Sequence, residues 1–131
     1  MSNQPTQGPD SRFIRSGPQL PVNNLQATIN YYRETLGFFN EWTEGEKDGG
    51  LQRDEMRLLF TEDPSFCASI NNAAHRLPLL WFVKGIETIY EEFQQRGIVF
   101  SDTLRVHPYG LREFAFIDIN GYYIRVAEPV A

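Results

Sequence analysis

Apolar residues recur at helical spacing in two stretches of the chain. In the first stretch, Leu25, Ile29, Tyr32 and Leu36 follow one another at intervals of four, three and four residues, and Gly37 comes directly after them. Such intervals place the apolar side chains on one side of a helix, and a glycine supplies the positive φ with which many helices end. The pattern predicts a helix whose apolar stripe lies on another element.

The second stretch repeats this arrangement. Ile86, Ile89, Tyr90 and Phe93 form an apolar stripe, and Gly97 ends it in the same way. The terminal glycines of the two stretches are 60 residues apart. Self-similarity of this length indicates two supersecondary units, each too small to bury its own apolar face.

Runs rich in β-branched and aromatic residues predict strands before and after each helix. The expected strands are 12–22, 38–43, 51–53, 56–61, 79–83, 99–106, 112–117 and 122–127, and prolines interrupt the first of them. We expect turns at Gly49-Gly50, at Asp54-Glu55 and at Asn120-Gly121, where Asn-Gly is the strongest short hairpin signal. The order is a strand, a helix and further strands, twice, which predicts an α+β fold.

These elements divide the chain into parts. Residues 12–131 form the predicted single domain, with a first βαβββ module at 12–62, a connecting segment at 63–77 and a second module at 78–128. Residues 1–11 are polar, contain two prolines and a glycine, and are predicted to be a disordered tail. A chain of 131 residues is long enough to bury a core of its own.

Composition excludes several classes of function. The chain has 17 acidic and 12 basic residues and a net charge of −5, which disfavours nucleic acid as a partner. No apolar run reaches the roughly 20 residues needed to cross a bilayer, and we expect no secretion signal. Cys67 is the single cysteine, which excludes an internal disulfide and favours a reducing cytoplasm. The acidic surplus suits either a cationic ligand or a solvated surface that aids solubility.

Several motifs together carry a resemblance to a known superfamily. They are Leu20-Pro21-Val22-Asn23-Asn24, Tyr31-Tyr32-Arg33, Leu36-Gly37-Phe38 and Arg112-Glu113-Phe114-Ala115-Phe116-Ile117-Asp118, followed by Asn120-Gly121. Over about residues 13–128 the chain resembles the glyoxalase/bleomycin-resistance/extradiol-dioxygenase (vicinal oxygen chelate) superfamily, and within it the bleomycin-resistance, drug-binding proteins. The resemblance implies two βαβββ modules that form curved mixed sheets around a central cleft, in a homodimer that exchanges an arm.

The resemblance also locates the positions that hold a divalent metal in the superfamily's enzymes. These positions are Gly17, Pro78 and Arg125 in this chain. Glycine and proline offer no side-chain donor and arginine is a cation, so we expect no metal, no other cofactor and no catalytic residue. His75 and His107 are the only histidines, and two dispersed imidazoles do not supply three convergent ligands.

Strand alternation indicates which residues line the cleft. If Gly17, Pro78 and Arg125 face the cleft, then so do the residues that alternate with them on the same strands, namely Gln19, Leu80, Phe82 and Tyr123.

On the strand that pairs with the one carrying Arg125, we expect Phe114 and Phe116 in the cleft, with Ala115 and Ile117 toward the helix. For each of these apolar residues, an ordinary core position is the alternative.

Proteins of the bleomycin-resistance type clamp a planar cationic drug between aromatic and acidic groups of both subunits. The resemblance carries this role to Glu41, Trp42, Thr61 and Tyr109, where stacking on rings and acidic attraction would supply affinity.

Three hypotheses follow. In the first, the chain is a metal-free homodimer that sequesters a small, cationic, partly aromatic ligand such as a bleomycin, without chemistry, as in antibiotic resistance. In the second, it is a metal-dependent lyase, isomerase or dioxygenase of the same superfamily with displaced ligands. In the third, the pocket is vestigial and the chain associates with another protein.

Overall fold

Two units of the same order follow each other along the chain in the computed structural model, which describes residues 8–130. The first unit comprises β1 (Gln19–Val22), α1 (Leu25–Glu34), β2 (Phe39–Glu44), β3 (Asp48–Arg53) and β4 (Met56–Glu62). The second comprises β5 (Pro78–Phe82), α3 (Ile86–Gln95), β6 (Phe100–Val106), β7 (Leu111–Ile117) and β8 (Tyr123–Pro129), and α2 (Pro64–Ile70) lies between the two units. The predicted pair of βαβββ modules is confirmed.

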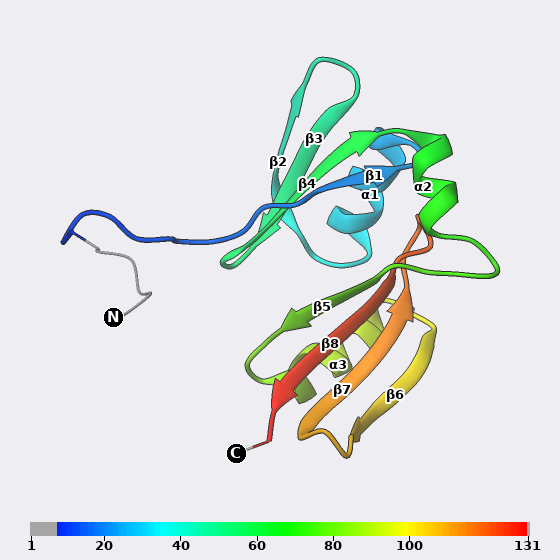
Figure 1. Ribbon diagram of the computed structural model, residues 1–131. Helices are drawn as coiled ribbons and strands as arrows, with labels where there is room; N and C mark the ends of the chain where they lie inside the picture. Colours follow the sequence, from blue (N-terminus) through cyan, green and yellow to red (C-terminus); the bar gives the residue numbers. More distant parts are fainter. Residues whose placement is uncertain (1–7, 131) are drawn as a thin grey trace.

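Each module forms its own four-stranded mixed sheet. The strand orders are β1-β4-β3-β2 and β5-β8-β7-β6, with one parallel pair in each sheet, β1 with β4 and β5 with β8. Figure 1 shows α1 behind the first sheet and α3 behind the second. Each sheet therefore has one face covered by its helix and one face that its own module leaves uncovered.

Local signals in the sequence set the ends of the two long helices. The Asn24 side chain accepts a hydrogen bond from the backbone N–H of Ala27 at 2.8 Å, so it caps the start of α1. Gly37 and Gly97 follow α1 and α3 with φ of 74° and 83°, a conformation that glycine adopts without steric cost. The predicted helix ends are confirmed.

The turn predicted at Gly49-Gly50 is wrong, because both glycines lie inside β3 and the chain turns instead at residues 45–47. These glycines are needed for close packing. A Cβ on Gly50 would lie 2.1 Å from the carbonyl oxygen of Leu58, and a Cβ on Gly49 would lie 2.7 Å from that of Trp42. Two adjacent glycines therefore mark a close approach of neighbouring strands here.

Two other expectations need correction. The strand predicted over 12–22 is regular only from Gln19, and residues 12–18 form no helix or strand. The connecting segment contains α2, which was not predicted. Its start carries a typical helix signal, because Asp63 accepts a hydrogen bond from the N–H of Phe66 and Pro64 begins the helix. Of the disordered tail predicted for 1–11, residues 1–7 lie outside the described part of the chain.

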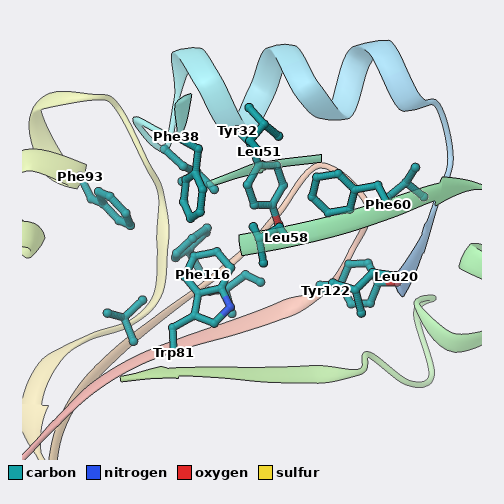
Figure 2. Close-up of a cluster of buried hydrophobic side chains, with 14 of the residues drawn as sticks. Leu20, Tyr32, Phe38, Leu51, Leu58, Phe60, Trp81, Phe93, Phe116 and Tyr122 are labelled. Atoms are coloured by element: carbon teal, nitrogen blue, oxygen red, sulfur yellow. The ribbon is translucent and has the colours of Figure 1, made fainter. Parts of the chain in front are cut away.

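The core is one cluster that extends through both modules. Trp81 of β5 lies at its middle, with ring centroids 5.7 Å from Phe38 and 6.3 Å from Tyr32 in the first module and 6.4 Å from Phe116 in the second. Figure 2 shows Trp81 among these rings. Tilted and edge-on aromatic pairs of this kind stabilise a core beyond the area they bury.

At one end of the boundary between the modules, a buried polar network joins them. The Tyr32 hydroxyl donates to the carboxylate of Asp118 at 2.5 Å, and the Tyr122 hydroxyl donates to the carbonyl of Pro21 at 2.7 Å. The side chain of Asn120 accepts from the N–H of Asn23 and donates to Thr28. We call Thr28, Tyr32, Asp118, Asn120 and Tyr122 the buried clasp. It holds the β7–β8 turn of the second module against the first (Figure 1).

Candidate ligand-binding face

The uncovered face of the second sheet carries an apolar surface that water reaches. On β5, Leu80 is 39% and Phe82 58% exposed, while Trp81 between them is buried against the helix side. Ile117 on β7 is 41% exposed. Large apolar side chains that cluster on one exposed face indicate an interaction surface, whereas single exposed apolar residues are common on any protein.

An ion pair lies in the middle of this face. The Arg125 guanidinium donates to both carboxylate oxygens of Glu113, with Nε–Oε2 at 2.7 Å and Nη2–Oε1 at 2.9 Å. The Tyr109 hydroxyl donates to Glu113 Oε1 at 2.9 Å, and the guanidinium carbon lies 5.8 Å from the Tyr109 ring centroid. The carboxylate is 3% exposed, so two donors hold it almost out of water.

These hydrogen bonds shift the pKa values of Glu113, Arg125 and Tyr109. Hydrogen bonds from Arg125 hold the pKa of Glu113 below its usual range, although burial opposes the shift. The same bonds raise the pKa of Arg125. Burial and the Glu113 acceptor raise the pKa of Tyr109. The three groups therefore form a neutral pair with an attached phenol, and the face carries no uncompensated charge at Arg125.

A histidine supports the tyrosine at the edge of this cluster. His107 is 7% exposed, and its ring stacks on that of Tyr109 with centroids 5.0 Å apart. Its Nε2 lies 3.3 Å from the Asp102 carboxylate, and no hydrogen bond satisfies this nitrogen within residues 8–130. His107 thus holds the Tyr109 loop rather than reaching out to solvent.

The uncovered face of the first sheet presents an indole. Trp42 pairs with Gly50, and a Cβ on Gly50 would lie 3.0 Å from the indole Nε1, so the missing side chain makes room for the ring. Leu59 and Thr61 lie on the same face by strand alternation and are half-buried.

The structure contradicts the expected positions of Phe114 and Phe116. Both are 0% exposed and lie on the helix side of the second sheet, with the Phe93 ring 5.8 Å and 5.7 Å from theirs. Ala115 pairs directly with Arg125, so Ala115 and Ile117 take the uncovered face instead. The prediction was wrong by one residue of register, which exchanges the two faces of a strand.

The expected position of Glu41 is also wrong. Its carboxylate accepts a hydrogen bond from Arg33 of α1, so Glu41 points toward the helix and away from the face of Trp42. Adjacent residues on a strand point to opposite sides, and the two could not both line one surface. Tyr123 and Arg125, like Leu80 and Phe82, do lie on the uncovered face of the second sheet.

The three positions at which the resemblance implies metal ligands lie on or beside the uncovered faces. A Cβ on Gly17 would contact Leu59, Pro78 pairs with Tyr123, and Arg125 is held by Glu113. None of the three residues offers a donor to a divalent cation. Within residues 8–130, no group of three or more His, Cys, Asp or Glu side chains is arranged to hold one.

The partner of Arg125 is the residue that sequence reasoning missed. Glu113 lies diagonally across the β7–β8 ladder from Arg125, because Ala115 is the direct partner. Pairing the strands outward from the Asn120-Gly121 turn would have found this diagonal, at which opposite charges stabilise a sheet.

A cavity that opens to solvent lies elsewhere, on the helix side of the second sheet. It has a volume of about 710 Å³ and is bounded by the β3–β4 turn, the end of β5, α3 and the end of β8. We call it the seam cavity, because residues of both modules line it. The β3–β4 turn that bounds it lies at the end of the boundary opposite the buried clasp (Figure 1). Phe82 is the only predicted site residue among its lining residues.

Comparison with known proteins identifies the family. Residues 16–126 match the Glyoxalase/Bleomycin resistance protein/Dioxygenase superfamily. The chain belongs to this superfamily. Comparison with curated protein sequences finds no match.

Solved structures of the superfamily share the fold at low sequence identity. A bleomycin resistance determinant encoded on the transposon Tn5 is 19% identical, with a TM-score of 0.74 over 89% of this chain and 98% of that chain. A bleomycin-binding protein from Streptomyces verticillus, in complex with copper(II)-bleomycin, is 21% identical, with a TM-score of 0.68 over 92% and 98%. A superfamily protein from Nocardioides is 17% identical, with a TM-score of 0.72 over 92% and 85%.

The superfamily contains both enzymes and binding proteins, so membership leaves the function of this chain to its own residues. Among the described helices, none is long and apolar enough to cross a membrane.

Proposed function

We propose that the chain is a metal-free binding protein that sequesters a small, cationic, partly aromatic molecule without chemistry, in the manner of the bleomycin-resistance proteins. The observation that carries the proposal is the centre of the second sheet's uncovered face. There, Arg125 and Tyr109 are hydrogen-bonded to Glu113, where the superfamily's enzymes have metal ligands. Exposed apolar side chains surround this cluster. Such a face offers area and ring stacking to a planar molecule.

A homodimer is part of the proposal. A single chain supplies only one wall of a cleft at each uncovered face. Leu80, Phe82 and Ile117 therefore stay exposed on the second sheet. A second copy would cover this face and form a cleft of two walls, as C2 interfaces do in most homodimers. Exchange of an arm stays a prediction, since the segment after β4 forms α2, whose buried Cys67 bonds to the carbonyl of Asn120 in its own chain.

Charge favours a cation as the ligand. The β2–β3 hairpin carries Glu44, Glu46 and Asp48 beside Trp42, while Arg125 is neutralised by Glu113. An acidic rim attracts a cation, and an indole face binds it once desolvated. The free thiol of Cys67 agrees with a reducing cytoplasm as the compartment.

Titration calorimetry with metal-free bleomycin tests the binding function. We expect a saturable signal with one site per cleft, and a loss of affinity of at least about tenfold in Trp42→Ala, because stacking on the indole is lost. Val99→Ala, at an exposed apolar residue between α3 and β6, serves as the control and should bind as the parent does. No heat with bleomycin or with simpler planar cations would reject the proposal and leave the vestigial pocket in its place.

Two further measurements separate this function from its alternatives. Sedimentation should show a dimer, and a monomer at all concentrations would remove the second wall of the cleft. Elemental analysis of the purified protein should show no stoichiometric metal. Zinc, nickel, manganese or iron bound tightly at one per chain would favour the metal-dependent enzyme.

A further inference from the structure

The seam cavity is a second place in the molecule with the size and walls of a ligand site. Its volume of about 710 Å³ lies within the roughly 300–1,000 Å³ of small-molecule pockets. It lies on the helix side of the second sheet, whereas Leu80, Tyr123 and Arg125 lie on the uncovered side, and Phe82 at the end of β5 is the one residue common to both. A ligand in the seam cavity would therefore be separate from one bound between two uncovered faces.

Three aromatic rings form its inner wall. Phe38, Trp81 and Phe93 are 4%, 8% and 3% exposed, and the rings of Phe38 and Trp81 lie 5.7 Å apart. The side chains of Met56 and Ile89 extend the apolar wall toward the mouth. A lining of aromatic rings and aliphatic side chains suits a planar aromatic molecule.

Two of the charged residues that line the cavity are already engaged. Arg53 is bonded to both carboxylate oxygens of Glu92, at 2.6 and 2.9 Å, and to the carbonyl of Leu36. The Glu128 carboxylate accepts from the backbone N–H groups of Gly85 and Ile86 at the start of α3. Both groups are therefore committed to holding the modules and the helix in place.

The remaining charges at the mouth favour a cation. Asp54 and Glu55 in the β3–β4 turn and Lys84 after β5 line the cavity, and within residues 8–130 none of the three takes part in an ion pair. Two acidic groups against one basic group leave a net negative rim, which attracts a cation and repels an anion of the same shape.

We propose that the seam cavity binds a planar aromatic cation, with the ring system on Phe38, Trp81 and Phe93 and the positive charge beside Asp54 and Glu55. Apart from Phe82, this site shares no residue with the uncovered faces, and it needs no second copy, so it stands whether or not the proposed function does. It gives each chain one binding place that is complete within a single copy.

The two tryptophans make the two sites separately observable, because Trp42 lies on the uncovered face of the first sheet and Trp81 in the wall of the seam cavity. Protein labelled with 5-fluorotryptophan should give two fluorine NMR resonances, and Trp42→Phe assigns them. Titration with proflavine, a planar tricyclic cation, should move the Trp81 resonance and saturate below about 1 mM. Anthracene-9-carboxylate, an anion of similar shape, should move it at least about fivefold less at equal concentration.

Charge variants test the orientation of the ligand. Asp54→Asn with Glu55→Gln should weaken proflavine binding at Trp81 about fivefold, since two rim charges are lost. Asn suits position 54, where φ is 52° and few other residues fit. The matched control, Glu44→Gln with Glu46→Gln on the β2–β3 hairpin, should leave the Trp81 titration unchanged.

Three results would overturn the proposal. The first is a Trp81 resonance that does not respond to proflavine at millimolar concentration. The second is equal binding of the cation and the anion. The third is a proflavine titration of Trp81 that Asp54→Asn with Glu55→Gln leaves unchanged. A response of Trp42 alone would support the proposed function and reject the seam site. A response of Trp81 alone would support the seam site and reject binding of this probe at the uncovered faces.

Discussion

The two ends of the boundary between the modules are built in opposite ways. At one end the buried clasp fills the space with polar groups that satisfy one another, and Tyr32 and Tyr122 in it are 1% exposed. At the other end the seam cavity leaves about 710 Å³ unfilled between aromatic and aliphatic walls. Both ends belong to the same pair of modules, so the difference lies in the side chains.

The physical chemistry of the two ends explains the difference. A buried carboxylate or amide must find every partner at hydrogen-bond distance, because an unsatisfied group costs about 1–3 kcal/mol, and this requirement fixes one arrangement. Apolar walls carry no such requirement, so a cavity between them can persist and accept a ligand. The clasp therefore sets how the modules lie, and the cavity uses the space that this arrangement leaves.

The largest effect should come from removing the central acceptor of the clasp. Asp118 accepts from the Tyr32 hydroxyl and from the N–H groups of Asn120 and Tyr122. Asp118→Ala leaves these buried donors without a partner, and we expect about 2–4 kcal/mol of lost unfolding free energy in urea titrations. Asp102→Ala, at a half-buried carboxylate of β6, is the control and should cost less than about 1 kcal/mol. Equal losses would show that the clasp has no special role.

The protonation of Asp118 gives the next largest effect. Burial raises its pKa from 3.8 to about 6, against the lowering effect of its hydrogen bonds. Because the folded-state value is the higher one, the stability linked to its proton is fully present below pH 3.8 and is lost as the pH rises through 6. The loss is about 3 kcal/mol over that window.

Other carboxylates act in the opposite direction, so the measurement must be a difference. Hydrogen bonds from Arg53 lower the pKa of Glu92, and those from Arg125 lower that of Glu113, so their contribution is lost as the pH falls below about 4.5. The stability of the parent minus that of Asp118→Asn should decline between pH 4 and 6.5. A flat difference across this range would contradict the raised pKa of Asp118.

A single hydroxyl of the clasp should have a smaller effect. Tyr122→Phe removes the donor to the buried carbonyl of Pro21 and should cost about 1–2 kcal/mol by chemical denaturation. Tyr31→Phe is the matched control on α1, because within residues 8–130 no hydrogen bond is found for the Tyr31 hydroxyl, and we expect a change below about 0.5 kcal/mol. Similar costs for both variants would mean that the hydroxyls of this region are interchangeable.

The smallest effect should come from adding volume at the open end. Ile89→Phe extends a side chain into the seam cavity, and we expect a change within about 0.5 kcal/mol, where a packed core would lose about 1–3 kcal/mol. Thermal denaturation measures it. Thr28→Val, which keeps the shape and removes a hydroxyl bonded to Asn24 and Asn120, should cost about 1 kcal/mol at the clasp. A large loss from Ile89→Phe would show that the cavity has no room for a ring.

The repeat and the helices could be predicted because local signals determine them. Apolar residues at helical spacing predicted α1 and α3, and Gly37 and Gly97 marked their ends. The Asn120-Gly121 turn likewise determined the β7–β8 hairpin. The glycines of β3 were misread, because their reason is the close approach of Leu58 and Trp42, which are near only in the folded sheet.

The candidate site was predicted in part. Alternation from Pro78 and Arg125 led to Leu80, Phe82 and Tyr123, which do lie on the uncovered face. It failed at Phe114 and Phe116, where the choice of face depended on the register of β7 against β8. Membership of Trp42, Thr61 and Tyr109 in a ligand site stays a prediction.

The sequence alone determined two βαβββ modules, their helix ends and the absence of side-chain donors at Gly17 and Pro78, because periodicity, glycine conformation and side-chain chemistry are properties of short segments. Tertiary structure alone decided that Glu113 neutralises Arg125, that Asp118 is buried under Tyr32, and that a cavity remains beside Trp81. These three features depend on how strands and modules meet, and contacts between residues far apart in the chain have no local signature.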